Sequence, residues 1–233
     1  MRGLFVTGTD TGIGKTTICT GLIWFLRNQG IEVGVMKPFA AAEKGFSSNY
    51  RSEDTYRLAL AAGSKSTDKQ INPFFYKVPA SPLVASKITH QKLPSLKNVV
   101  RQVLDESKKY RYMIIEGIGG IMVPISRTYT IAEFARYLGF PIVVVASAKL
   151  GSLNHILLTL EACFNHHLDV IAIVINRMPK RSDMSQRLLV STVRQLTGIR
   201  TTFSIPEFHR EPDPTSVGSI LNGKWHILDA LRP

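Results

Sequence analysis

Apolar positions recur along the chain with either the period of a strand or the period of a helix. This pattern predicts that strands and helices alternate from one end of the chain to the other. Short apolar strands are expected at residues 3–7, 31–36, 112–115, 141–146 and 170–175, with another near Thr202. Helical spacing predicts helices at residues 15–28, 52–62, 95–109, 130–138, 152–166 and 183–197, and a weak helix at the C-terminus. Residues 40–50 are small and polar and are expected to form a loop, whereas residues 72–94 hold four prolines and are expected to be irregular.

The predicted strands are β-branched and apolar on both faces, which is typical of a parallel sheet covered by helices. The sequence contains no repeat, low-complexity tract or evident linker. It therefore predicts an α/β fold with a central, mostly parallel sheet flanked by helices, in a single domain over residues 1–233.

The composition argues against several classes of protein, namely membrane, secreted, zinc-binding and nucleic-acid-binding proteins. The longest apolar stretch, residues 141–148, is too short for a membrane helix, and the N-terminus turns polar too early for a secretion signal. No membrane association and a cytoplasmic location are therefore expected. Cys19 and Cys163 lack the spacing of a zinc or redox pair and are expected to be packed within helices. The net charge of +12 is spread out with no nucleic-acid-binding signature, so we interpret it as a solvated basic surface and do not expect a nucleic-acid partner.

A glycine-rich loop from Gly8 to Thr17 separates the first strand from the first helix. Such a turn points backbone N–H groups at bound phosphate, and Lys15 and the Thr16 hydroxyl are expected to reach the terminal phosphates and magnesium. The strict pattern needs a glycine six positions before the lysine, where this chain has Thr9; the loop is thus a variant. It predicts a three-layer P-loop NTPase-type domain whose nucleotide-binding residues include Gly12, Ile13, Gly14, Lys15, Thr16 and Thr17.

Three charged residues are candidates for the same site. Glu116 follows an apolar strand and precedes three glycines within four residues, at the sheet edge where ligands bind in open α/β folds. Lys37 follows the second strand at the same edge. Asp54 is compatible with a magnesium ligand and equally with a first-turn carboxylate favoured by the helix dipole.

Taken together, these segments resemble the dethiobiotin synthetase family, the ATP-dependent ring-closing enzymes of biotin synthesis. The resemblance covers residues 3–210. It rests on the P-loop variant, Met36-Lys37-Pro38, Glu53-Asp54, Ser81-Pro82, Glu116-Gly117-Ile118-Gly119-Gly120, Pro124, Lys149-Leu150-Gly151-Ser152-Leu153-Asn154-His155, Asn176-Arg177 and Ile205-Pro206-Glu207.

The resemblance implies a reaction and roles for residues. The family's diamine, 7,8-diaminononanoate, reacts with CO2 to form a carbamate, which attacks the γ-phosphate of ATP, and the second amine then closes the ureido ring. Magnesium is implied to bind Thr16, Asp54 and Glu116. Lys15 and Lys37 are implied to neutralise negative charge, and Thr11 to lie close to the diamine or its carbamate, so these three are the catalytic candidates.

The resemblance also implies a homodimer in which the substrate's carboxylate tail lies against a helix N-terminus of the partner subunit. Gly151, Ser152 and Asn154 match that helix start, although the two polar side chains are equally compatible with simple helix caps. Asn176 matches the asparagine that contacts adenine in the family. It is also compatible with a turn residue that has no such role. Pro206 and Glu207 match a segment near the base and ribose.

Some positions depart from the family pattern. Members often carry serine where this chain has Ala41, a position implied to bind substrate, and alanine where it has Ile118. Arg127 stands where an acidic residue is common. These departures put substrate affinity in question more than the type of reaction.

The alternatives to this function are a partition-type ATPase switch, a GTPase and a related ligase. A partition-type ATPase switch carries a signature lysine beside the loop's first glycine, where this chain has Asp10. A GTPase reads guanine with Asn-Lys-x-Asp, whereas the run beginning at Asn176 has no aspartate. A related ATP-dependent amide-forming or carboxylating ligase acting on another small substrate stays open, because a shared scaffold does not fix the substrate.

Overall fold

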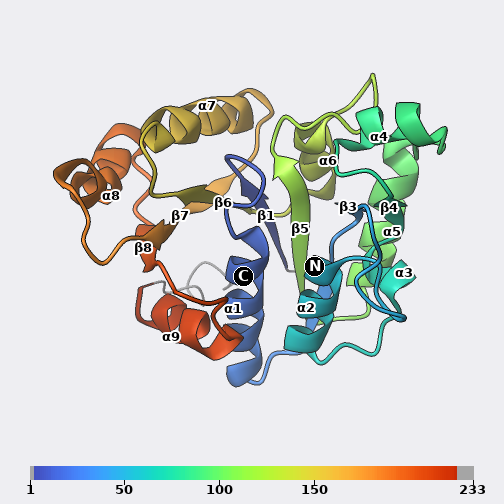
Figure 1. The fold of residues 1–233 in the computed structure, drawn as a ribbon, viewed down its shortest axis with the longest axis horizontal. Coiled ribbons are helices and arrows are strands. Elements are labelled where there is room, and N and C mark those ends of the chain that lie inside the picture. Colours follow the sequence, from blue (N-terminus) through green and yellow to red (C-terminus); the bar gives the residue numbers. More distant parts are fainter. Residues whose placement is uncertain (1–2, 225–233) are drawn as a thin grey trace.

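A six-stranded sheet forms the centre of the molecule in the computed structural model, which describes residues 3–224 (Figure 1). All of its paired strands run parallel, in the order β2-β5-β1-β6-β7-β8. The strands are β1 (Gly3–Gly8), β2 (Val33–Met36), β5 (Tyr112–Gly120), β6 (Ile142–Ser147), β7 (Val170–Met178) and β8 (Thr202–Pro206). The predicted fold class is thereby confirmed. Both ends of the predicted domain, at residues 1 and 233, lie outside the described residues.

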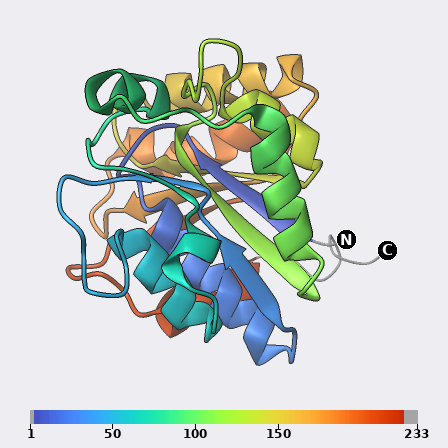
Figure 2. The ribbon, with the colours of Figure 1, turned by 90° about the vertical axis from the view of Figure 1, so that its right-hand side faces the viewer.

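Helices cover both faces of this sheet (Figures 1 and 2). One face packs against α1 (Lys15–Asn28), α2 (Glu53–Ala62), α3 (Asp68–Ile71) and α9 (Pro214–Lys224), and the other against α5 (Leu96–Ser107), α6 (Ile131–Leu138), α7 (Ser152–Asn165) and α8 (Met184–Thr197). The period of two in β1 divides its side chains between the two cores: Phe5 faces one, and Leu4 and Val6 face the other. The continuous apolar runs of the sequence follow from this two-sided burial.

The stretch expected to be irregular contains regular structure, so that prediction was wrong. Within residues 72–94, β4 (Phe74–Tyr76) pairs in parallel with β3 (Phe39–Ala41). The last two residues of β3 belong to the stretch 40–50, which was expected to be a loop. A helix, α4 (Pro82–Thr89), follows, and the Ser81 side chain accepts a hydrogen bond from Val84 N. Pro82 opens this helix because proline at the first position loses no intrahelical hydrogen bond.

Two strands extend three or more residues beyond their predicted ends, whereas β1 and β6 extend by one residue. β5 continues through the glycines to Gly120, which pairs with Gly8 of β1 after an irregularity in the register. Glu116 therefore lies within the strand, opposite Val6, rather than at its end. β7 likewise runs to Met178 and includes Asn176.

Both cysteines are buried within helices, as expected: Cys19 in α1 and Cys163 in α7. Within residues 3–224, no helix combines the length and apolar character needed to cross a bilayer.

Candidate functional site

The phosphate loop is held in a conformation that requires glycine. Gly12 and Gly14 have φ values of 71° and 93°, in the left-handed region that side chains disfavour. A Cβ on Gly14 would lie 2.1 Å from Nδ2 of Asn176, which donates a hydrogen bond to the Ile13 carbonyl at 2.9 Å. Asn176 therefore fixes the loop from β7.

Four polar side chains from separate elements meet beside this loop. The Lys37 ammonium, just after β2, lies 2.5 Å from Asp54 Oδ2 and 2.6 Å from Glu116 Oε1. The Thr16 hydroxyl, in the first turn of α1, lies 3.0 Å from Asp54 Oδ1 and 2.9 Å from Glu116 Oε1. Asp54 is in the first turn of α2, as predicted, and its carboxylate also belongs to the site.

Burial and charge shift the ionisation of these groups. Burial lowers the pKa of Lys37, but the carboxylates of Glu116 and Asp54 raise it by more. The pKa of Lys37 therefore lies well above the ordinary lysine value. Burial alone would raise the pKa of Asp54, whereas Lys37 and the Thr16 hydroxyl bring it below its ordinary value. Lys15 differs, because desolvation lowers its pKa, and its Nζ donates to the Asp10 carbonyl at 2.9 Å.

The same cluster has the donor atoms that a divalent metal ion needs. Glu116 is 1% exposed, and its Oε2 is buried without a hydrogen-bond partner within residues 3–224. Two carboxylates and a hydroxyl are hard oxygen ligands of the kind that magnesium prefers. The residues present therefore fit a magnesium ion bound by Thr16, Asp54 and Glu116.

A cavity of about 400 Å³ opens over this cluster. It is lined by Thr11, Gly12, Gly14, Lys15, Thr16, Thr17, Lys37, Ala40, Ala41, Asp54, Arg57, Pro79, Ala80, Ser81, Glu116, Ile118, Gly119, Val123, Arg177 and Glu211. The three catalytic candidates, the three metal-ligand candidates and Ala41 thus share one cavity. Ile118 also lines it, whereas Arg127 is exposed and lies elsewhere.

Sequence reasoning assigned no role to three charged residues that line the cavity, Arg57, Arg177 and Glu211. Glu211 forms an ion pair with Arg57, and its Oε1 accepts a hydrogen bond from the Thr17 hydroxyl at 2.5 Å. Arg57 lies three positions after Asp54 on α2, which puts both residues on one side of the helix. That spacing is the one signal that could have identified Arg57; nothing in the local sequence marks Glu211.

The remaining predicted residues lie outside this cavity. The Ser152 hydroxyl donates to the Ser147 carbonyl and accepts from Lys149 N at 3.0 Å, so it stabilises the turn into α7, while Asn154 is exposed. Gly151 and Ser152 line a second cavity of about 230 Å³. Pro206 and Glu207 are exposed at the end of β8, where Glu207 N donates to the Met178 carbonyl at 2.8 Å.

Comparison with known sequences gives matches over nearly the whole chain. A family model described as an AAA domain matches residues 2–212. The ATP-dependent dethiobiotin synthetase of Nitrosopumilus maritimus is 37% identical over 235 residues, covering 100% of both chains. The proteins of the same name from Bacillus licheniformis and Anaeromyxobacter dehalogenans strain 2CP-C are 33% and 35% identical, covering 97% and 96% of this chain and 94% and 99% of their own.

Solved structures with the same fold include ATPases of other kinds. A ParA family ATPase from Chlorobium tepidum superposes with a TM-score of 0.53 at 18% identity, covering 95% of this chain and 92% of its own. The MinC:MinD cell division complex of Aquifex aeolicus gives 0.53 at 15% identity, with 94% and 86% covered. At such identities the likeness concerns the fold alone.

Proposed function

The chain belongs to the ATP-dependent dethiobiotin synthetase family, and we propose that it closes the ureido ring of dethiobiotin in the cavity beside its phosphate loop. It is a ligase of biotin biosynthesis that uses ATP. The observation that carries the assignment of the site is the Lys37 ammonium, buried between Asp54 and Glu116 and adjacent to the loop.

The loop and its lysine bind the polyphosphate in this proposal. The N–H groups at the start of α1 donate to phosphate oxygens, and the Lys15 ammonium neutralises charge on the terminal phosphates. Desolvation lowers the pKa of Lys15 more than Glu116 and Asp54 raise it, and Lys15 forms no ion pair within residues 3–224, so a bound phosphate would supply a close anionic partner. Asn176, which fixes Ile13, is placed by the same proposal near the adenine, with Pro206 and Glu207 close to the base and ribose.

Magnesium held by Thr16, Asp54 and Glu116 would neutralise charge on the two terminal phosphates of ATP. In the structure the Lys37 ammonium bridges the same two carboxylates. A cation held there would compensate the charge of Asp54 and Glu116, and the Lys37 ammonium, which lines the cavity, would then be available to the substrate.

The reaction proceeds from the diamine, 7,8-diaminononanoate, and CO2. One amine adds to CO2 and loses a proton, giving a carbamate whose oxygen attacks the γ-phosphorus as ADP leaves. The second amine then attacks the carbamoyl carbon and loses a proton as phosphate departs, which closes the ureido ring. Lys37 and Lys15 stabilise the negative charge of both steps, which is the main means of catalysis in phosphoryl transfer. Thr11 and Ala41 line the diamine side of the cavity, where Ala41 offers no hydroxyl to the substrate.

The proposal includes a homodimer with a site shared between subunits. Gly151, Ser152 and Asn154 lie outside the cavity of their own chain, at the N-terminus of α7. Leu150 beside them is 98% exposed, and Leu158 and Phe164 on α7 are exposed as well. A second copy packed on this face would cover these apolar side chains and bring its α7 N–H groups to the carboxylate tail of the diamine. We place the reaction in the cytoplasm, where ATP is available.

Phosphate release with product analysis by mass tests the proposal. The protein is incubated with ATP, magnesium and bicarbonate, with and without 7,8-diaminononanoate. We expect phosphate release that depends on the diamine and a product with the mass of dethiobiotin. Phosphate release indifferent to the diamine, and stimulated by DNA or by another small substrate, would contradict the proposal and favour a partition-type switch or a related ligase.

A further inference from the structure

The backbone at Lys37 has little support from the main sheet. The pairing of β2 with β5 ends at Met36, and Pro38 has no N–H to donate. The carbonyl groups of Lys37 and Pro38 therefore need donors from elsewhere, because a buried carbonyl without a partner is costly. Lys37 is only 5% exposed, so water does not readily provide them.

Asn72 supplies the missing donor. This side chain is fully buried directly after α3, and its Nδ2 lies 2.7 Å from the Lys37 carbonyl and 3.4 Å from that of Pro38. The segment around it adds two backbone bonds: Lys37 N donates to the Ile71 carbonyl, and Phe74 N to the Pro38 carbonyl, both at 3.0 Å. The position of the Lys37 Cα is thus set by the segment after α3.

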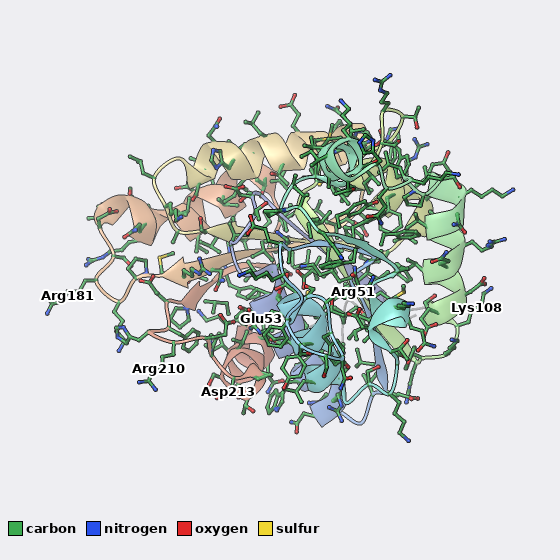
Figure 3. The ribbon with its side chains drawn as sticks, turned by 45° about the vertical axis from the view of Figure 1, so that its right-hand side comes forward. Arg51, Glu53, Lys108, Arg181, Arg210 and Asp213 are labelled. Atoms are coloured by element: carbon green, nitrogen blue, oxygen red, sulfur yellow. The ribbon has the colours of Figure 1, made fainter. Side chains whose placement is uncertain are left out.

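An arginine holds that segment in turn. Arg51 Nε donates to Asp68 Oδ2 at 2.5 Å, and Arg51 Nη2 donates to the Asn72 carbonyl. Its guanidinium also lies over the Phe75 ring, 5.2 Å from the centroid. Figure 3 shows Arg51 between the start of α2 and α3. Three directed contacts fix a planar guanidinium more firmly than an ammonium group would be fixed.

Arg51 also stands three positions before Asp54 and immediately before Ser52, the first flanking residue of α2. The same arginine therefore anchors the helix start that carries Asp54 and, through Asn72, the backbone that carries Lys37. From this geometry we propose that Arg51, Asp68 and Asn72, here called the α3 clamp, are positioning residues that hold the Lys37 ammonium at the reacting groups. The inference rests on the proposed function of Lys37.

The clamp contacts neither the loop nor its lysine, so its loss should affect turnover more than ATP binding. Asn72→Asp keeps the size of the side chain and removes the amide donor, and Asn72→Ala removes the whole group. We expect each to lower kcat by roughly 10- to 100-fold, since a displacement of about 1 Å can cost that much. The KM for ATP should stay within roughly threefold, because uniform binding by the loop is unchanged. Arg51→Lys should retain more turnover than Arg51→Met.

An activity-independent measurement separates positioning from general destabilisation. Hydrogen exchange of the Lys37 amide should accelerate in both Asn72 variants, while exchange at Val144 in β6 stays unchanged. Val193→Ala, a buried truncation in α8 on the other face of the sheet, is the stability control and should leave kcat unaltered.

The inference is overturned if the Asn72 variants keep the wild-type kcat, or if Val193→Ala, at a similar loss of thermal stability, lowers kcat as much as they do. It is also overturned if Lys37 exchange does not change. These outcomes differ from failure of the proposed function, in which the wild-type protein itself forms no dethiobiotin.

Discussion

The cavity beside the phosphate loop and the outer face of α7 differ in how their side chains are partnered. Around the cavity, charges pair with one another: the buried Lys37 and Glu116 contact each other, Lys37 also contacts the partly exposed Asp54, and at the cavity surface Arg57 contacts Glu211. On α7, large apolar side chains are exposed, with Phe164 at 79%. A buried charge without a partner is costly, so the first region must be satisfied within the chain.

The comparison shows which parts of the site are built within one chain. In the proposed site, the groups assigned to phosphate and metal all come from one chain, at or next to β2, β5, α1 and α2. The residues implied to bind the carboxylate tail, Gly151, Ser152 and Asn154, stand apart from these groups. We infer that single substitutions of polar residues impair the phosphate and metal groups. Binding of the carboxylate tail, in contrast, is impaired by substitutions that change how two copies associate.

The largest effect is expected from Lys37→Gln. Removing a charge aimed at the transferring group should lower kcat by roughly 100- to 1,000-fold. ATP binding, measured by calorimetry, should change far less because Lys15 and the loop remain. A variant with near-wild-type phosphate release would show that the buried ammonium has no part in turnover.

The α7 face is tested by Leu158→Glu, which puts a charge on an exposed apolar helix face. If a second copy covers this face, light scattering should show monomers, and the KM for the diamine should rise about tenfold or more, as for a central interface residue. ATP affinity should be unaffected. Leu60→Glu, on an exposed leucine of α2, is the matched control and should leave the assembly intact. Dimers that persist in Leu158→Glu would contradict the interface.

A change in acid stability is expected next. The pKa of Asp54 is lowered in the folded protein, so its contribution to the free energy of unfolding is present above its ordinary value of 3.8 and is lost as the pH falls below it. Lys37→Gln removes the main group that lowers this pKa. The variant should therefore be less stable than the wild type at pH 7, and this difference should shrink as the pH falls toward 3, measured by urea unfolding. Identical acid profiles would mean that the ion pair is not formed in solution.

The smallest effect is expected from Arg57→Gln. The substitution removes a cation that lines the cavity, so the KM for ATP should rise by fivefold at most, since exposed ion contacts contribute about 1 kcal/mol or less. Lys108→Gln breaks an exposed pair with Asp105 on α5 and should change neither KM nor stability measurably. A large loss of kcat in Arg57→Gln would place this arginine among the groups that act on the transferring phosphate.

Local patterns explain what the sequence could predict. Alternation of strand and helix and the loop between Gly8 and Thr17 depend on residues that are neighbours in the chain, so they are readable without a structure. The candidates Lys37 and Glu116 were identifiable because strand ends in parallel sheets meet at one edge. The sequence allows two interpretations of Asp54, because its position in the first helical turn is explained by the helix dipole alone.

The missed features depend on tertiary packing or on proline chemistry. Thr17 and Glu211 stand 194 positions apart and meet where the chain leads from β8 into α9. Asn72 reads as a residue of a proline-rich stretch, and its importance appears only through its bonds to Lys37 and Pro38. In the same stretch, Pro82 begins a helix rather than interrupting one. The prolines of this stretch led to a prediction of irregular structure, whereas Pro82 marks the start of a helix.

The strand order has a consequence for the growing polypeptide. β5 lies between β1 and β2, so the loop after β1 and the lysine after β2 do not come into register until residues near 120 have joined the sheet. A nascent chain that already contains the complete glycine-rich loop thus has no nucleotide pocket. Parallel strands that are far apart in the sequence pair slowly, because the chain loses the entropy of loop closure before the new contacts stabilise it. Nucleotide binding can therefore stabilise this chain only after the central strand has been inserted, and gives no assistance to the earlier steps of folding.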